Sequence, residues 1–176
     1  MGHGLSRAAD HIERLTGAVG RAAAWCALLV VLLQLAVVLL RYLVGVGSVW
    51  LHESVFYAHA ALFMLAAAWT LAENGHVRVD IFYADATPRR KALLDLAGAL
   101  VFLIPFALAL LLLSLPYAAR SWAILERSRE VSGLPAVFLP KTLIPLFALL
   151  MILQGIAQAM RAIEVLRAPP AADAAE

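Results

Sequence analysis

The residues most able to do chemistry in this chain are the few ionisable side chains inside or beside long apolar stretches. Arg41 ends the first such stretch, and His52, Glu53 and His59 lie in the second. A charged or polar group in lipid is costly and usually faces protein, so each is a candidate functional residue. Arg41 and Glu53 are expected at about the same depth across a short hairpin. Two alternatives follow: a local ion pair, or separate contacts with a partner protein.

The two histidines of the second stretch do not indicate a haem site. His52 and His59 are seven residues apart and share a helix face. A haem would need another imidazole at matching depth on a facing helix, but His3, His11 and His76 lie outside the apolar stretches. The sequence also contains no Cys/His cluster, glycine-rich phosphate loop or Ser/His/Asp arrangement. We therefore expect no catalytic site, no cofactor, no resident metal and no enzyme activity.

Four apolar segments must position these side chains. A helix rises about 1.5 Å per residue, so about 20 apolar residues cross a hydrocarbon core of about 30 Å. The composition, with 64% hydrophobic and 15% charged residues, excludes a soluble domain, and a net charge of +2 does not indicate a nucleic-acid partner. The sequence predicts an all-α integral membrane protein with four transmembrane helices and short interfacial helices. The expected spans are residues 22–44, 50–72, 92–116 and 138–160, and the tryptophans at their ends are Trp25, Trp50, Trp69 and Trp122.

The segments outside these spans divide the chain into three parts. Residues 1–21 are predicted to form an amphipathic surface helix with Ser6 as its N-cap, lying on the anionic phospholipids of the inner leaflet. Residues 22–165 form the membrane domain. Residues 166–176 are rich in alanine and proline and are predicted to be disordered.

Glycine and proline residues predict where the helices end. The short connection 44–49 contains two glycines and predicts a tight turn between antiparallel neighbours. Gly75 is expected at the C′ position after the second helix. Residues 76–86 are expected to form an interfacial connection.

The second half of the chain is predicted in the same way. Thr87 and Pro88 are expected to be the N-cap and first residue of the third helix, and Pro105 is expected to kink it. Residues 117–130 have helical propensity and are expected along the outer interface. Pro140 and Pro145 crowd the start of the fourth helix.

One stripe of the second helix mixes a carboxylate with aromatic and small residues. Trp50, Glu53 and Tyr57 recur with Ala61 and Ala68 at helical spacing. Small residues let helices approach closely, so we expect this stripe to face protein.

Two runs of sequence resemble a known family. The run RYLVGVGSVWLHE (residues 41–53) and the run ENGHVRVDIF (residues 73–82) are similar to the signature of the DctQ-like small permease subunit of tripartite ATP-independent periplasmic (TRAP) transporters. The resemblance covers about residues 20–165. One departure is His52, which stands where the family often has the first of two adjacent acidic residues. The motif residues, with Tyr57 of the stripe, form the expected partner interface: Arg41, Tyr42, Trp50, Glu53, Tyr57, Gly75, His76 and Asp80.

The resemblance implies a small, non-enzymatic transporter subunit in the bacterial inner membrane, with both termini in the cytoplasm. Its implied partners are a large permease subunit, which carries the substrate and sodium sites, and a periplasmic protein that captures an organic acid. The small subunit would then scaffold the large one.

Two other functions remain as alternatives from the residues alone. A self-sufficient small transporter would form a homodimer and use Glu53 as its essential carboxylate, although Glu53 is expected near an interface and not at mid-depth. A non-transport membrane anchor subunit would need cofactor ligands, which the sequence does not offer.

The distribution of basic residues generates a topology prediction. Lys and Arg are more frequent in the N-terminal segment, the second connection and the C-terminal segment than in the two other connections, which favours cytoplasmic termini. Reporters fused near residue 85 and at the C-terminus should report a cytoplasmic location, and one near Ser128 should report a periplasmic location. The reverse pattern would contradict the prediction.

Overall fold

The computed structural model describes residues 2–77, 83 and 85–168, and these residues form helices and connections without a strand. Helix α1 (Gly2–Leu39) continues into the π-helix η1 (Leu40–Val44), and α2 (Val49–Ala72) follows. Helix α3 (Pro88–Ala97) passes through the π-helix η3 (Gly98–Leu103) into α4 (Ile104–Ala123), and α5 (Phe138–Arg167) ends the described part. Within these described ranges four helices are long and apolar enough to cross a membrane, which confirms the prediction of an all-helical chain with four such segments.

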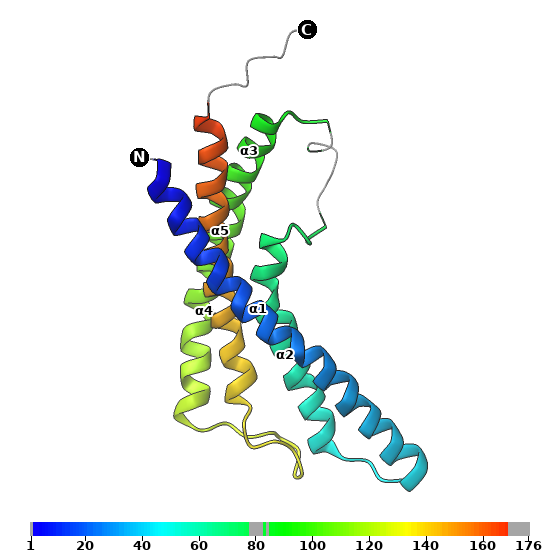
Figure 1. Ribbon diagram of the computed structural model, residues 1–176. Coiled ribbons are helices and arrows are strands. Elements are labelled where there is room, and N and C mark those ends of the chain that lie inside the picture. Colours follow the sequence, from blue (N-terminus) through cyan, green and yellow to red (C-terminus); the bar gives the residue numbers. More distant parts are fainter. Residues whose placement is uncertain (1, 78–82, 84, 169–176) are drawn as a thin grey trace.

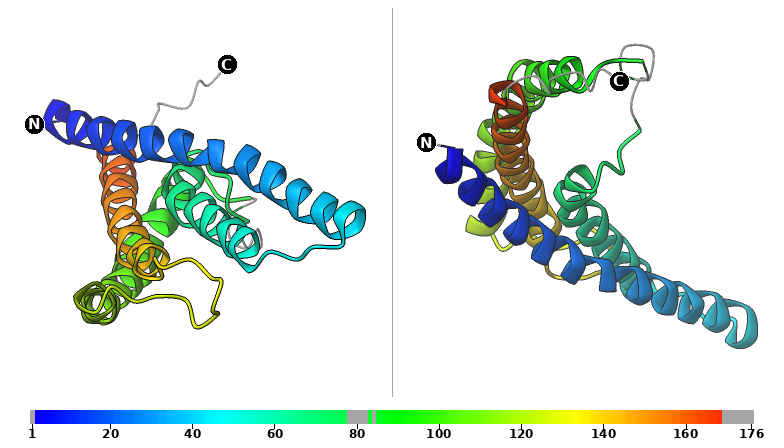
Figure 2. Two further views of the ribbon diagram at one scale, coloured as in Figure 1. Left: turned by 90° about the horizontal axis from the view of Figure 1, so that it is seen from below. Right: turned by 45° about the horizontal axis from the view of Figure 1, so that its top comes forward.

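The helices form two hairpins that diverge from one another. Helices α1 and α2 pack along each other, and α4 packs along α5 (Figure 1). Helix α1 also crosses α5 obliquely, so the hairpins meet near the beginning of α1 and separate toward the connection 45–48 (Figures 1 and 2). The beginnings of α1 and α3 and the end of α5 lie at one end of the molecule, which we call the terminal end.

The first helix differs from the expectation of a separate surface helix over residues 1–21. A single helix runs from Gly2 to Leu39, and Ser6 lies inside it instead of capping it. The physical reason is packing: a Cβ atom at Gly20 would lie 2.3 Å from the Cβ of Trp69, so only glycine allows α1 to cross α2 this closely. Thr16 is fully buried in this region. Burial against α2 and α5 therefore holds this segment in the bundle.

The turn between α1 and α2 forms as the glycines predict. Gly45 has φ +74°, a left-handed conformation that glycine adopts readily. The Ser48 hydroxyl accepts a hydrogen bond from the Leu51 N–H at 3.3 Å and caps α2.

The end of α2 differs from the expectation in the residue that takes the left-handed conformation. Asn74, with φ +56°, is the left-handed residue, and not Gly75. The Gly75 N–H donates to the Thr70 carbonyl at 2.8 Å and the Asn74 N–H donates to the Leu71 carbonyl at 3.1 Å, the hydrogen-bond pattern of a Schellman motif. Asparagine tolerates this conformation because its short polar side chain can bond locally.

The second hairpin agrees with the sequence at its start and differs near Pro105 and at its end. Thr87 caps α3 and Pro88 is its first residue, as predicted. The π-helix η3 ends two residues before Pro105, so regular α-helical hydrogen bonding is interrupted on the N-terminal side of this proline. Helix α4 ends at Ala123, and Leu125 turns the chain with φ +45°, so the helix predicted over residues 117–130 stops early. Pro140 and Pro145 both lie within α5.

The two hairpins are joined by a small core and one buried hydrogen bond. Ala68, Ala107, Leu150 and Met151 form the buried apolar cluster. The Thr16 hydroxyl of α1 donates to Gln154 Oε1 of α5 at 2.9 Å. A hydrogen bond between helices in a membrane stabilises by about 1 kcal/mol. Most other large apolar side chains are exposed and are available to lipid or protein.

Candidate functional site

Glu53 of α2 contacts the connection between α4 and α5, residues 124–137, which we call the strap. The Ser128 hydroxyl donates a hydrogen bond to Glu53 Oε1, and the Leu134 N–H donates to Oε2 at 2.5 Å. Both carboxylate oxygens therefore have partners within the chain. Charge-assisted hydrogen bonds of this kind are among the stronger ones in proteins.

Gly133 makes this contact possible. A Cβ atom at this position would lie 2.3 Å from the Ser128 Oγ and 2.8 Å from Glu53 Oε1, closer than non-bonded atoms approach. The Ser128 N–H also donates to the Leu134 carbonyl at 3.1 Å, which folds the strap back on itself. The glycine thus lets the strap backbone lie directly against the carboxylate.

Glu126 attaches the other side of the strap to α4 and α5. It accepts hydrogen bonds from Lys141 Nζ at 2.5 Å and from the Ser121 hydroxyl at 2.7 Å. The bond from Lys141, followed by that from Ser121, lowers the pKa of the Glu126 carboxyl, so it stays ionised at a pH where an ordinary glutamate begins to protonate. The strap therefore joins the first hairpin to the second at the end opposite the termini.

Arg41 does not form the local ion pair that was one of the two alternatives. It lies exposed in η1, and no salt bridge joins it to Glu53 in the described part of the chain. Tyr42 beside it is 81% exposed and Trp50 is 50% exposed. These three motif residues thus lie on the outer surface of the first hairpin, while Glu53 faces the strap.

Tyr57 lies one turn beyond Glu53 on α2. Its hydroxyl is buried and has no hydrogen-bond partner among the described residues. The Tyr57 side chain lines an apolar crevice of about 310 Å³ between α2 and the start of α5, with Leu139, Leu143 and Leu146. A buried hydroxyl without a partner costs about 1 to 3 kcal/mol, so an acceptor from another molecule would be favourable here.

The remaining predicted residues lie elsewhere. Gly75 and His76 follow the end of α2, far along that helix from Glu53, and Asp80 lies outside the described residues. The structure therefore does not bring the whole predicted set together. Within the described ranges no group of three His, Cys, Asp or Glu residues could hold a metal ion.

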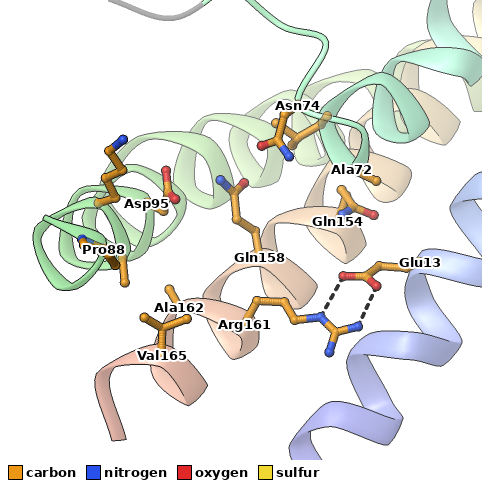
Figure 3. Close-up of a pocket in the computed structure, with 13 residues that line it drawn as sticks. Glu13, Ala72, Asn74, Pro88, Asp95, Gln154, Gln158, Arg161, Ala162 and Val165 are labelled. Carbon is orange, nitrogen blue, oxygen red and sulfur yellow. Dashed lines mark hydrogen bonds and ion pairs between the residues drawn. The ribbon is translucent and has the colours of Figure 1, made fainter. Parts of the chain in front are cut away.

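A cluster at the terminal end was missed by the sequence reasoning. Arg161 of α5 forms a two-pronged contact with Glu13 at 2.8 and 3.1 Å (Figure 3). It also donates to Asp10 at 2.5 Å. Arg161 directly follows the expected span 138–160, and its partners Asp10 and Glu13 lie in the segment 1–21 that was expected to form a surface helix. We call this contact the Arg161 clamp.

The comparison with protein families gives one match. The model of the DctQ component of tripartite ATP-independent periplasmic transporters matches residues 28–165, which reach from α1 into α5. No curated protein and no solved structure matches the chain.

The strap generates a prediction about Glu53. Glu53→Gln removes the charge that accepts two hydrogen bonds, so the strap should loosen and the protein should lose about 1.5 to 3 kcal/mol of stability. Gly133→Ala should act in the same direction. Limited proteolysis within residues 127–131 measures the loosening.

Arg41→Gln is the matched control, since Arg41 makes no contact with the strap. It should leave proteolysis unchanged. Equal protection of Glu53→Gln and the unmodified chain would show that the carboxylate does not hold the strap.

Proposed function

We propose a scaffolding role for this chain, which belongs to the DctQ family of TRAP transporter components. It is a multi-pass membrane protein and a small subunit of such a transporter, in a family of transport components and not of enzymes. In our proposal it supports the large permease subunit during sodium-driven uptake of an organic acid, which a periplasmic binding protein delivers. The family match over residues 28–165 is the observation that carries this proposal.

The state of Glu53 supports a scaffold in preference to a self-sufficient transporter. An ion-coupling carboxylate must exchange its ligands during transport, but both oxygens of Glu53 accept hydrogen bonds from the strap of the same chain. We therefore assign Glu53 a structural role in this subunit.

The surfaces of the first hairpin indicate where the large subunit could pack. Trp25 is 75% exposed, Tyr42 81% and Phe56 69%, and the exposed Arg41 has no ion pair to a described residue. The crevice beside Tyr57 adds an apolar recess. A partner helix carrying a carboxylate for Arg41 and apolar side chains for the crevice would complement both.

In an alternating-access transporter one domain moves against another, so the domain that stays still must be held rigidly. The strap and the Arg161 clamp join the two hairpins of this chain at opposite ends.

We further propose a bacterial inner-membrane location with both termini cytoplasmic, supported by the basic residues of the N-terminal segment and the second connection.

Co-expression tests the proposal. The chain should co-purify with the large permease subunit, and proteoliposomes should take up an organic acid with sodium only when both subunits and the binding protein are present. Arg41→Gln should reduce recovery of the complex without changing the fold of the chain alone. Sodium-dependent uptake by this chain without the large subunit would contradict the scaffolding role.

A further inference from the structure

One exposed side of α2 carries a histidine near the middle of the helix. His59 is exposed, and its imidazole forms no hydrogen bond or ion pair with another residue in the part of the chain that the structure describes. His59 follows Val49 by 10 residues and precedes Ala72 by 13. At a rise of roughly 1.5 Å per residue, it lies about 15 Å from one end of the helix and about 20 Å from the other. This helix is long and apolar enough to cross a membrane.

Lipid is an unfavourable surrounding for this imidazole. A polar group that enters hydrocarbon without a hydrogen-bond partner costs free energy, and histidines within membrane spans almost always face protein or a water-filled cavity. The side chain is too short to reach water from the middle of α2. A protein neighbour with a polar group at the same depth removes this cost, because polar side chains form hydrogen bonds between membrane helices.

The residues around His59 form a continuous stripe on α2. We call His52, Phe56, His59 and Phe63 the histidine seam. Successive members are 4, 3 and 4 residues apart, which is the spacing of side chains that contact one facing helix. Phe56 is 69% exposed and Phe63 is 70% exposed. Tyr57 lines the crevice against α5 from another side of the helix, so the seam is a separate surface.

We propose that the histidine seam binds one transmembrane helix of the large permease subunit. This helix presents a side-chain oxygen to His59 and small residues to Phe56 and Phe63, since small residues let helices approach closely. In a neutral imidazole one ring nitrogen donates a hydrogen bond, so a carboxylate, amide or hydroxyl oxygen satisfies it. A partner at this depth must itself span the membrane, which excludes a soluble protein. The inference rests on the proposed function, because it names the large subunit as the partner.

Photo-cross-linking tests the seam on the full chain in complex with the large subunit in nanodiscs. Benzoylphenylalanine in place of Phe56 or Phe63 keeps an aromatic ring at the position and should form covalent adducts with the large subunit. Phe102 of η3, which is 73% exposed on the second hairpin, is the matched control and should give little adduct. Equal adduct from Phe102, or adduct mainly with a second copy of this chain, would overturn the proposal.

Substitution of His59 distinguishes a protein neighbour from lipid. His59→Leu keeps an apolar surface and removes the hydrogen bond, so it should weaken binding of the large subunit roughly fivefold. The thermal stability of the chain alone should not fall, because the imidazole has no partner among the described residues. His59→Gln can still form a hydrogen bond and should recover most of the binding. Unchanged or tighter binding in His59→Leu is the result expected for a lipid-facing histidine and would overturn the proposal.

Failure of this inference differs from failure of the proposed function. If the unmodified chain does not bind the large subunit, the proposed function is contradicted, and so is the inference that rests on it. If the complex forms, yields no adduct from Phe56 or Phe63 and tolerates His59→Leu, only the role of the histidine seam is contradicted.

Discussion

The contact between Arg161 and the two carboxylates of α1 is the interaction on which the arrangement of this molecule depends. Apolar side chains find lipid as favourable as protein, so hydrophobic burial alone does not fix one membrane helix against another. Here Arg161 binds Asp10 and Glu13 at the terminal end, and the Thr16–Gln154 hydrogen bond continues the contact toward the centre. Together they draw the first turns of α1 across α5 and keep them in the bundle.

The strap is the counterpart of this clamp at the opposite end. Glu53 holds the backbone of residues 128–134, and Glu126 holds the same connection against Lys141. Between these two attachments the core cluster of Ala68, Ala107, Leu150 and Met151 joins the hairpins, and the crevice beside Tyr57 lies between α2 and the start of α5. A chain fastened at both ends and joined by this core keeps its shape while it presents apolar surface to a partner, which is the property our proposed scaffold needs.

The sequence predicted the parts of the fold that depend on local chemistry. Gly45 and Gly47 indicated the first turn, Thr87 and Pro88 indicated the start of α3, and the apolar segments indicated four helices. The length of α1 was not predictable in this way, because the contact of Gly20 with Trp69 joins residues far apart in the chain. Asn74 took the left-handed position expected for Gly75 because both residues tolerate it.

The candidate site was predicted only in part for the same reason. Glu53 was singled out from the sequence, but its partners Ser128 and Leu134 lie in a connection that was expected to be helical to residue 130. Arg161 was counted only among the basic residues of the C-terminal segment, because its partners were assigned to a surface helix. A charge in an apolar segment reveals that a partner is needed, but only the tertiary structure reveals which one.

The most direct test of the role of Arg161 is the distance between the two hairpins at the end of the molecule opposite the termini. Spin labels at Val44 and Ile124, both exposed, can be introduced in a Cys26→Ser background and measured by double electron–electron resonance. The account predicts one narrow distance distribution that broadens in Arg161→Gln and stays narrow in Arg167→Gln, which removes an exposed arginine from the last turn of the same helix. A distribution that is equally broad in all three proteins would contradict it.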